Sequence, residues 1–418
     1  MKKTALLITL LMCVMLLVCC ARQSVLTSGE NGETDINSVS DNAETDISST
    51  QDAPDGTLTD IDASSDDAAL IDEPPVSVGG DQQEICDSLS ESYSALCVQA
   101  AVIKNGRVDS VYSYGTAERS TGREVNEDTK YRVASITKLV SVMVFFCLKQ
   151  EGLVDENADI SVYFDYPCHS PYYPDTVITP LMIMSHTASM VDVGPMYLSD
   201  GTLSSKSFYI GYEPGTFYAY SNSGFAVIQC ICERVTGMEF DAIAKQYIFE
   251  PLGIDAAYIA SGLKDTSNLG ELRELTISTM LSRKPRPLGT GLNFAQGNLY
   301  CSAKDYAKIL CLLMNDGLTA DGTRILSTES INTMKTVRIS NDSFGVALGM
   351  RKQTNVFQNK TVYTHTGSSY GLYSAYLFSP EEKSGVVVIT SGCPPEKDET
   401  TQIYRACLNY ITALYPEN

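Results

Sequence analysis

Residues 131–148 read YRVASITKLVSVMVFFCL, and the rest of the chain is interpreted outward from this stretch. After Lys138 it is apolar with almost no polar interruption, which predicts a helix buried on nearly all sides. If that helix begins near Ser135, the serine and Lys138 lie one above the other, because residues i and i+3 are neighbours on a helix. The serine then lies at the positive end of the helix dipole, where a developing anion is favoured.

Ser135 and Lys138 can therefore act as a nucleophile and its base. An ammonium group is costly to keep charged in an apolar setting, so we expect Lys138 to accept the serine proton. Alone, the S-x-x-K spacing is weak evidence, because a serine at this place is also a common helix cap. A second copy, Ser261 to Lys264, is interpreted as a decoy, since it contains a glycine and no apolar run follows it.

A second motif, Tyr220-Ser221-Asn222, stands on a loop just before an apolar helical pattern. Alternation along an extended stretch puts the phenol and the amide on the same side. A phenol near an ammonium can be drawn towards phenolate and accept a proton, and an amide can hold a lysine and a substrate carbonyl at once. The alternative is that Asn222 is only the N-cap of a helix starting at Ser223.

The third motif, His365-Thr366-Gly367-Ser368, is predicted at the end of a strand that begins near Thr361. Glycine at such a position lets a substrate backbone lie close to the strand edge. The N–H of Ser368 is expected to join that of Ser135 as a pair of oxyanion donors. His365 and Thr366 are expected to face the substrate's carboxylate or leaving group; the alternative is a plain solvent-facing strand end.

A near-copy of the third motif, His186-Thr187-Ala188, precedes Tyr220 and lacks the glycine. We expect His186 to have a structural role, capping or packing, away from the three motifs.

In the order S-x-x-K, Y-x-N, H-T-G, these residues resemble the class C β-lactamase-like serine hydrolases, whose relatives include penicillin-binding proteins, D-alanyl-D-alanine carboxypeptidases, esterases and D-amino-acid amidases. The resemblance covers roughly residues 88–415. It implies a β-lactamase/transpeptidase-like fold, with a central antiparallel sheet flanked by helices and an all-helical subdomain inserted after the nucleophile helix.

The resemblance also implies roles for the motif residues. Ser135 is implied to be the acylated nucleophile and Lys138 its proton acceptor. Tyr220 is implied to be the partner base that activates the deacylating water, and Asn222 to orient Lys138 and the substrate amide. His365 stands where β-lactamases carry lysine, and a mostly neutral imidazole offers a carboxylate less fixed charge. That departure is closer to the peptidase and esterase branches.

The N-terminus predicts export. Lys2 and Lys3 precede an apolar run and small residues, so residues 1–19 are typical of a secretory signal. The sequence around Cys20 resembles the lipobox of bacterial lipoproteins, which implies acylation of Cys20, with Cys19 as the other possible acceptor and a plain signal peptide as the alternative. We expect a protein lipid-anchored to the bacterial membrane on its extracytoplasmic side.

Residues 20–84 are predicted to form a disordered acidic tether. Between Ala21 and Glu84 there are sixteen Asp and Glu, no aromatic residue and one basic residue, Arg22, so about 15 of the net charge of −21 lies there. Low hydrophobicity with high like charge does not favour a packed core. The acidic balance argues against nucleic acid as a partner.

Residues 85–418 are predicted to form one hydrolase domain of class α+β, with strands first, helices inserted and strands last. We expect a hairpin around Asn105-Gly106. The remaining elements are expected as follows: helices over 82–93, 178–185, 224–236, 302–314 and 399–414, and strands over 344–350, 361–366, 372–378 and 385–390.

The histidines and cysteines, which are the usual metal ligands, predict no metal site here, and no motif predicts a cofactor. Only three histidines are present, and no C-x-x-C pair has partners. Cys147, Cys230, Cys232 and Cys311 are interpreted as small core residues. Cys86 and Cys97 are a candidate disulfide.

The function expected first is a penicillin-binding D,D-carboxypeptidase-like hydrolase of the cell envelope, acting through an acyl-enzyme on amide, peptide or ester bonds. An esterase or D-amino-acid amidase comes next, and a class C-like β-lactamase third. The alternative that is not an enzyme is a non-catalytic relative that binds peptidoglycan. The partners expected are small-molecule or peptide substrates, including peptidoglycan stem peptides and β-lactams, together with the membrane.

Overall fold

The computed structural model describes residues 80–192, 211–283, 288–289 and 295–416. The predicted signal, Cys20 and most of the predicted tether lie outside the described residues. The first described helix is α2 (Gly80–Ser92), which begins within the last residues of the predicted tether. Among the described residues, no helix has both the length and the apolar character needed to cross a bilayer.

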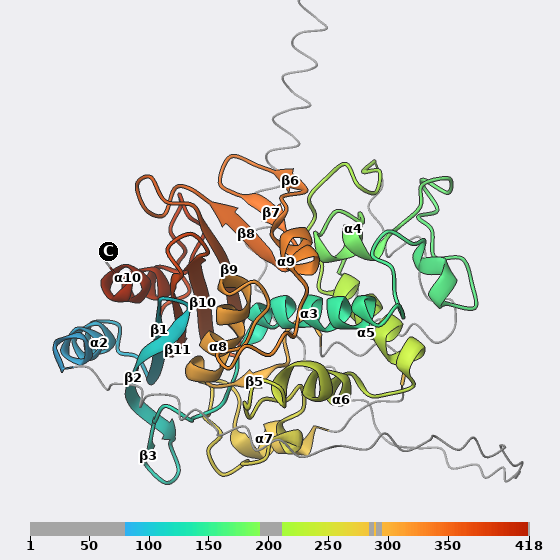
Figure 1. The fold of residues 1–418 in the computed structure, drawn as a ribbon. Helices are drawn as coiled ribbons and strands as arrows, with labels where there is room; N and C mark the ends of the chain where they lie inside the picture. Colours follow the sequence, from blue (N-terminus) through green and yellow to red (C-terminus); the bar gives the residue numbers. More distant parts are fainter. Residues whose placement is uncertain (1–79, 193–210, 284–287, 290–294, 417–418) are drawn as a thin grey trace, which may run out of the picture. The chain divides into compact units, whose positions relative to one another are not determined.

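The core of the fold is one large antiparallel sheet built from both ends of the domain (Figure 1). Its strand order is β3-β2-β1-β11-β10-β9-β8-β7-β6, and β1 joins the N-terminal hairpin to the C-terminal strand β11. The nine strands are β1 (Cys97–Lys104), β2 (Arg107–Glu118), β3 (Arg123–Glu124), β6 (Ile339–Ser340), β7 (Gly345–Ala347), β8 (Met350–Gln353), β9 (Val362–Ser369), β10 (Leu372–Ser379) and β11 (Ser384–Ser391). A separate pair is formed by β4 (Tyr131–Arg132) and β5 (Tyr300–Cys301).

Most helices lie between the two groups of strands in the sequence, as expected for an inserted helical subdomain. The described helices besides α2 are α3 (Thr137–Gln150), α4 (Pro180–Met184), α5 (Ser223–Thr236), α6 (Phe240–Ala244), α7 (Ile277–Ser282), α8 (Ala303–Met314), α9 (Thr328–Lys335) and α10 (Arg405–Leu414), with short helical turns η1 (Ala134–Ile136), η2 (Ile160–Tyr163), η4 (Lys245–Phe249) and η5 (Ala260–Gly262). This architecture confirms the predicted fold class.

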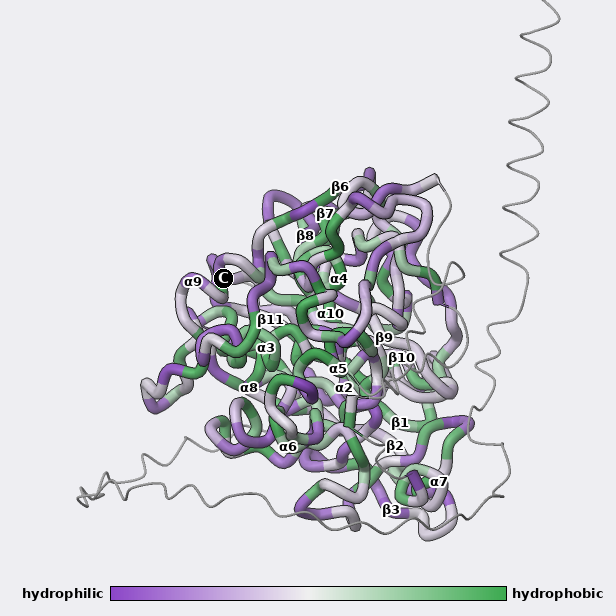
Figure 2. Tube along the Cα trace, turned by 90° about the vertical axis from the view of Figure 1, so that its right-hand side faces the viewer, coloured by the Kyte–Doolittle hydropathy of each residue, from purple (hydrophilic) through white to green (hydrophobic). Residues whose placement is uncertain are grey.

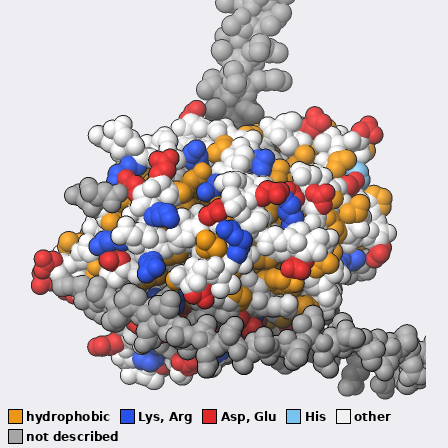
Figure 3. All heavy atoms as spheres, in the orientation of Figure 1, with side chains coloured by type: hydrophobic (Ala, Val, Ile, Leu, Met, Phe, Trp, Pro, Cys, Tyr) orange, Lys and Arg blue, Asp and Glu red, His pale blue; other side chains and the backbone are white. Residues whose placement is uncertain are grey.

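The two faces of the sheet are covered by different helices. One face packs against α2 and α10 through a smaller core that includes Cys407, Tyr410 and Ile411. The other packs against α3 and α8 in the main core. Figure 2 shows hydrophobic segments running through α3 and α5. Charged side chains of both signs are interspersed on the face drawn in Figure 3.

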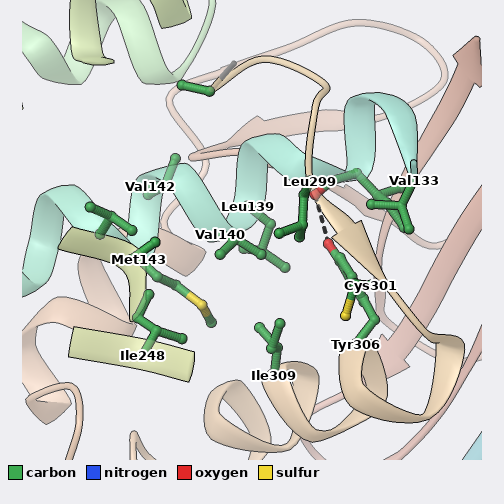
Figure 4. Close-up of a cluster of buried hydrophobic side chains, with 14 of the residues drawn as sticks. Val133, Leu139, Val140, Val142, Met143, Ile248, Leu299, Cys301, Tyr306 and Ile309 are labelled. Atoms are coloured by element: carbon green, nitrogen blue, oxygen red, sulfur yellow. Dashed lines mark hydrogen bonds between the residues drawn. The ribbon is translucent and has the colours of Figure 1, made fainter. Parts of the chain in front are cut away.

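Helix α3 lies in the middle of the main core, which is why its sequence carries so few polar residues. Figure 4 shows Leu139, Val140 and Met143 pointing towards Tyr306 and Ile309 of α8. Burying side chains of this size contributes about 1.5–3 kcal/mol each. The start of α3 is also fixed by hydrogen bonds, since the Tyr306 hydroxyl donates to the carbonyl oxygen of Ile136 at 2.6 Å. A helix held in this way is a rigid support for a residue at its N-terminal end.

Two of the predicted elements are wrong in detail. Residues 344–350, predicted as one strand, form β7, a turn and the start of β8, because Gly349 adopts a left-handed φ of 65° and reverses the chain. The closing helix begins at Arg405 rather than near Glu399, since residues 398–404 form a turn held by the Asp398 carboxylate. The hairpin at Asn105-Gly106 is confirmed, with both residues at positive φ.

The candidate disulfide between Cys86 and Cys97 is wrong: both thiols are free. Cys86 belongs to the core beneath α2 and α10, whereas Cys97 belongs to the main core. Successive strand residues point to opposite faces, and Val98, the neighbour of Cys97, is the one that shares the Cys86 core. The side chains are therefore separated by the sheet itself. Cys147, Cys230 and Cys232 are buried as predicted, and Cys311 is partly buried.

Candidate active site

The accessible point in the buried nucleophile segment is Ser135. Every residue from Thr129 to Leu148 is buried except Ser135, which is partly exposed. It lies in the middle of η1, and the preceding Ala134 has a φ of +54°. A non-glycine residue in this region is uncommon and costs free energy that the surrounding packing must offset. The left-handed turn brings the serine to the surface while its neighbours stay in the core.

Lys138 is completely buried, one turn further along, and its amine faces three oxygens. Nζ donates to Asn222 Oδ1 at 2.7 Å and to the carbonyl oxygen of Gln296 at 2.7 Å, and it lies 3.4 Å from Ser135 Oγ. Two carbonyl acceptors occupy two of the N–H groups. The third tetrahedral position of the nitrogen is therefore directed at the serine, as a donor when charged and as a lone pair when neutral.

Tyr220 completes the group around the serine. Its phenol is hydrogen-bonded to Ser135, and Lys138 Nζ lies 4.8 Å from the centre of its ring. Burial raises the pKa of the phenol above its ordinary value of 10, and the hydrogen bond to Ser135 acts in the opposite direction. Burial therefore favours the neutral phenol in the free enzyme.

His186, which we expected to lie away from the motifs, packs directly against them. Its ring lies 4.4 Å from that of Tyr220, and its Nδ1 accepts the backbone N–H of Ser221 at 3.2 Å. The carbonyl oxygen of His186 also accepts the N–H of Ala219 at 2.8 Å. Its role is packing, as predicted, but what it packs against is the loop that carries Tyr220.

Asn222 is held from two sides. Its Oδ1 faces Lys138, and its Nδ2 donates to Asp192 Oδ2 at 2.9 Å. Asn222 is at the N-cap position of α5, but its side chain makes no capping hydrogen bond. The capping alternative raised from the sequence is therefore wrong for the side chain, which reaches the lysine instead.

The third motif occupies the later part of β9, which begins at Val362 and ends at Ser369. His365 and Thr366 are buried, and Ser368 is exposed. Strand β8 pairs with β9 only as far as Thr364, so the edge from His365 onwards has no strand partner among the described residues.

Gly367 lies against the nucleophile turn. A Cβ atom there would be 2.9 Å from the backbone nitrogen of Ser135, 2.8 Å from the carbonyl oxygen of Val133 and 2.4 Å from Ser374 Oγ. We predicted that this glycine makes room for a substrate backbone. The structure shows that it first makes room for the chain's own nucleophile turn.

His365 is 4% exposed, and its surroundings keep it neutral. Burial lowers the pKa of its imidazole well below the usual 6.5, and the positive charges of Arg351 and Lys138 act in the same direction. Arg351 forms no ion pair within the described ranges, and its guanidinium lies 4.2 Å from the centre of the Phe344 ring. The position that carries lysine in β-lactamases is thus uncharged here, with an arginine nearby.

Sequence reasoning missed Gln296 and Asp192. Gln296 acts through a backbone carbonyl, for which a sequence carries no signal. Asp192 lies thirty residues before the asparagine it contacts, and only the fold brings them together. The decoy serine, Ser261, lies exposed in η5, a three-residue turn that ends before Lys264.

The fold and this arrangement of Ser135, Lys138, Tyr220 and Asn222 define the class: a serine hydrolase with a lysine beside its serine. The Beta-lactamase family matches residues 83–408, and the chain belongs to this family.

Two similar proteins agree with that assignment. The chain is 23% identical over 330 residues to penicillin-binding protein 4 of Amycolatopsis lactamdurans, covering 74% of this chain and 84% of that protein. It is 26% identical over 181 residues to the D-alanyl-D-alanine-carboxypeptidase/endopeptidase AmpH of Escherichia coli, covering 39% of this chain and 45% of AmpH.

Solved structures show the same fold at low identity. The octameric penicillin-binding protein homologue from Pyrococcus abyssi superposes with a TM-score of 0.60 at 21% identity, over 75% of this chain and 74% of that one. The class C β-lactamase from Rhodobacter sphaeroides does so with a TM-score of 0.60 at 17% identity, over 80% and 98%.

The two buried histidines make stability depend on pH. Burial lowers the pKa of His186 well below 6.5, as it does for His365, and nearby positive charges add to the effect. In the unfolded chain each imidazole takes up a proton as the pH falls through about 6.5. The unfolded state then binds more protons than the folded state, so the free energy of unfolding decreases below pH 6.5.

We expect each of these histidines to contribute a loss of about 1.4 kcal/mol per pH unit well below 6.5. Urea unfolding of the wild type and of His186→Gln at pH 8, 6 and 5 measures this. The wild type should lose more stability than the variant between pH 8 and 5. Equal losses in the two proteins would show that His186 is protonated in the folded state.

Proposed function

We propose that this protein is a penicillin-binding, D,D-carboxypeptidase-like enzyme that cleaves its substrate through an acyl-enzyme on Ser135. The observation that carries the proposal is the hydrogen bonding of Lys138. With two of its N–H groups held by Asn222 and Gln296, the lysine directs its third position at Ser135 Oγ. In the neutral amine that position is a lone pair able to take the serine proton.

The proposed reaction has two halves. In acylation the Ser135 proton passes to Lys138 as Oγ bonds to the substrate carbonyl carbon. The Tyr220 hydroxyl protonates the departing nitrogen or oxygen and is reprotonated from Lys138. In deacylation the oxygen of a water molecule bonds to the acyl carbon as the bond from that carbon to Ser135 Oγ breaks. The water proton passes to Oγ, and the acid product leaves. We propose the N–H groups of Ser135 and Ser368 as the oxyanion donors.

The third motif supports the proposal that the site recognises the carboxylate of a peptide substrate. His365 is neutral, so it offers a hydrogen bond rather than a fixed charge. The Thr366 side chain points to the opposite face of the sheet, because its strand partner Ala375 belongs to the core beneath α2 and α10. Arg351 is the first of the cations that act on His365, and we propose that it pairs with the carboxylate. Penicillin-binding protein 4 and AmpH, two of the relatives, are named for penicillin binding and for carboxypeptidase activity.

A substrate panel tests this proposal. A fluorescent penicillin should add its mass to Ser135, and a peptide ending in D-Ala-D-Ala should be cleaved faster than the same peptide amidated at its C-terminus. Arg351→Gln should lower kcat/KM for the free carboxylate peptide by about tenfold, roughly 1.4 kcal/mol for a partly screened charge. Activity on p-nitrophenyl butyrate should stay unchanged.

The outcomes separate the alternatives. Faster cleavage of esters than of any D-Ala-D-Ala peptide would favour an esterase, and rapid turnover of nitrocefin would favour a β-lactamase. No adduct with any reagent would favour the non-catalytic, peptidoglycan-binding relative.

We further propose that the enzyme is exported and anchored by a lipid on Cys20. The proposal is supported by the signal-like residues 1–19 and the lipobox-like sequence around Cys20. Cys20→Ser should move the protein from the membrane to the soluble fraction of cells. If only Cys19→Ser does so, Cys19 is the acceptor; if the double variant still sediments with membranes, the lipid anchor is wrong.

A further inference from the structure

The N-terminus of α5 is capped by a side chain from a distant loop. Asp192 Oδ1 accepts the backbone N–H of Asn222 at 2.7 Å and that of Ser223 at 2.9 Å. It also accepts the hydroxyl of Ser221 at 3.1 Å, and Ser221 Oγ in turn accepts the N–H of Gly224 at 3.1 Å. Asp192 and Ser221 together satisfy donors that a helix usually leaves for its own N-cap side chain.

This arrangement releases the Asn222 side chain. An asparagine at an N-cap ordinarily turns its oxygen back onto the N–H groups of the first turn. Those N–H groups are already bonded here, and Asn222 makes no capping bond of its own. Its Oδ1 is instead available to Lys138 at 2.7 Å.

Asp192 also decides which way the amide faces. Its Oδ2 accepts from Asn222 Nδ2 at 2.9 Å. A carboxylate has only acceptors and an amide NH₂ only donors, so this contact requires the NH₂ to face Asp192. The carbonyl oxygen must then face Lys138. A flipped amide would place oxygen against a carboxylate and NH₂ against the lysine amine.

We propose that Asp192 is a positioning residue of the active site, which orients Asn222 so that its carbonyl holds Lys138 towards Ser135. This inference rests on the proposed function, because it assigns Asp192 a part in activating the same serine. Asp192 acts through Asn222 and contacts neither Ser135 nor Lys138 in any described hydrogen bond. The loop that carries Asn222 is anchored by His186. The His186 carbonyl oxygen accepts the N–H of Ala219, and its ring accepts the N–H of Ser221.

The variant Asp192→Asn separates the two roles of Asp192, which are to orient the Asn222 amide and to cap the N-terminus of α5. The new side chain keeps one oxygen for the backbone N–H groups but presents an NH₂ to the NH₂ of Asn222, which favours the flipped amide. We expect the acylation rate with a p-nitrophenyl ester to fall about 100-fold, with KM changed less than threefold and the melting temperature within about 2 °C of the wild type. Asp192→Ala should lose both activity and melting temperature.

A double variant tests whether Asp192 acts through Asn222. If it does, Asp192→Asn combined with Asn222→Ala should be no slower than Asn222→Ala alone, since residues that act as one unit are not additive. A matched control is Asp255→Ala, whose carboxylate also accepts two backbone N–H groups, those of Lys264 and Asp265. This control should acylate at the wild-type rate.

The results that overturn the proposal are distinct from those that overturn the function. A wild type that forms no Ser135 adduct with penicillin or ester contradicts the proposed function. A wild type that forms the adduct, beside an Asp192→Asn variant that forms it equally fast, contradicts only the positioning role. Rate losses that multiply in the double variant would also contradict it, because Asp192 would then act independently of Asn222.

Discussion

Ser135→Ala should abolish both covalent labelling by penicillin and turnover of every substrate, while leaving the fold intact. The alanine removes the one partly exposed side chain between Thr129 and Leu148, and with it the hydroxyl that lies 3.4 Å from Lys138 Nζ. The serine hydroxyl caps no helix, so its loss should cost little stability. Intact-mass spectrometry, initial rates and a thermal unfolding curve measure the three quantities.

Lys138→Ala should slow acylation nearly as much, because the serine then keeps its proton and is a poor nucleophile. The variant should also be less stable, since it leaves Asn222 Oδ1 and the Gln296 carbonyl without their donor. The double variant should be scarcely slower than either single one. Ser261→Ala, in the exposed S-x-x-K copy, is the matched control and should be silent. Ordinary turnover by Ser135→Ala would end the assignment of this serine as nucleophile.

Gly367→Ala is expected to have the second largest effect. The added methyl group would lie within 2.9 Å of the Ser135 backbone nitrogen and of the Val133 carbonyl oxygen, and neither can move without shifting the nucleophile turn. The Ser374 hydroxyl, which donates to the same Val133 oxygen at 2.7 Å, is displaced as well. We expect a loss of about 1–3 kcal/mol in stability from overpacking and a fall of about 100-fold in acylation from the displaced serine.

Gly385→Ala is the control for the crowding itself. Its Cβ would lie 2.8 Å from the carbonyl oxygen of Leu377, in the same sheet but between β10 and β11. It should lose stability to a similar degree and keep the specific activity of the folded enzyme. Equal activity losses in the two glycine variants would mean that Gly367 matters only for packing. Unfolding in urea and single-turnover labelling provide the two measurements.

Much of the fold could be predicted because its signals are local. The Asn105-Gly106 turn requires positive φ at two successive residues, and the structure has both. The apolar run after Lys138 predicts a buried helix, and α3 is buried along nearly its whole length. Residues 344–350 misled the strand prediction because their apolar character is the same on both sides of a turn that depends on Gly349.

The sequence by itself determined the nature of the groups in the candidate site: a serine and a lysine one helical turn apart, a Y-x-N loop and an H-T-G strand. Spacing along one helix or strand fixes such relations, since the backbone geometry is regular. Only the tertiary structure decided how those groups are oriented and charged. The neutral states of Tyr220 and His365 come from burial, and the direction of the Asn222 amide comes from Asp192. Burial and contacts between distant segments arise when the chain packs, so no local pattern encodes them.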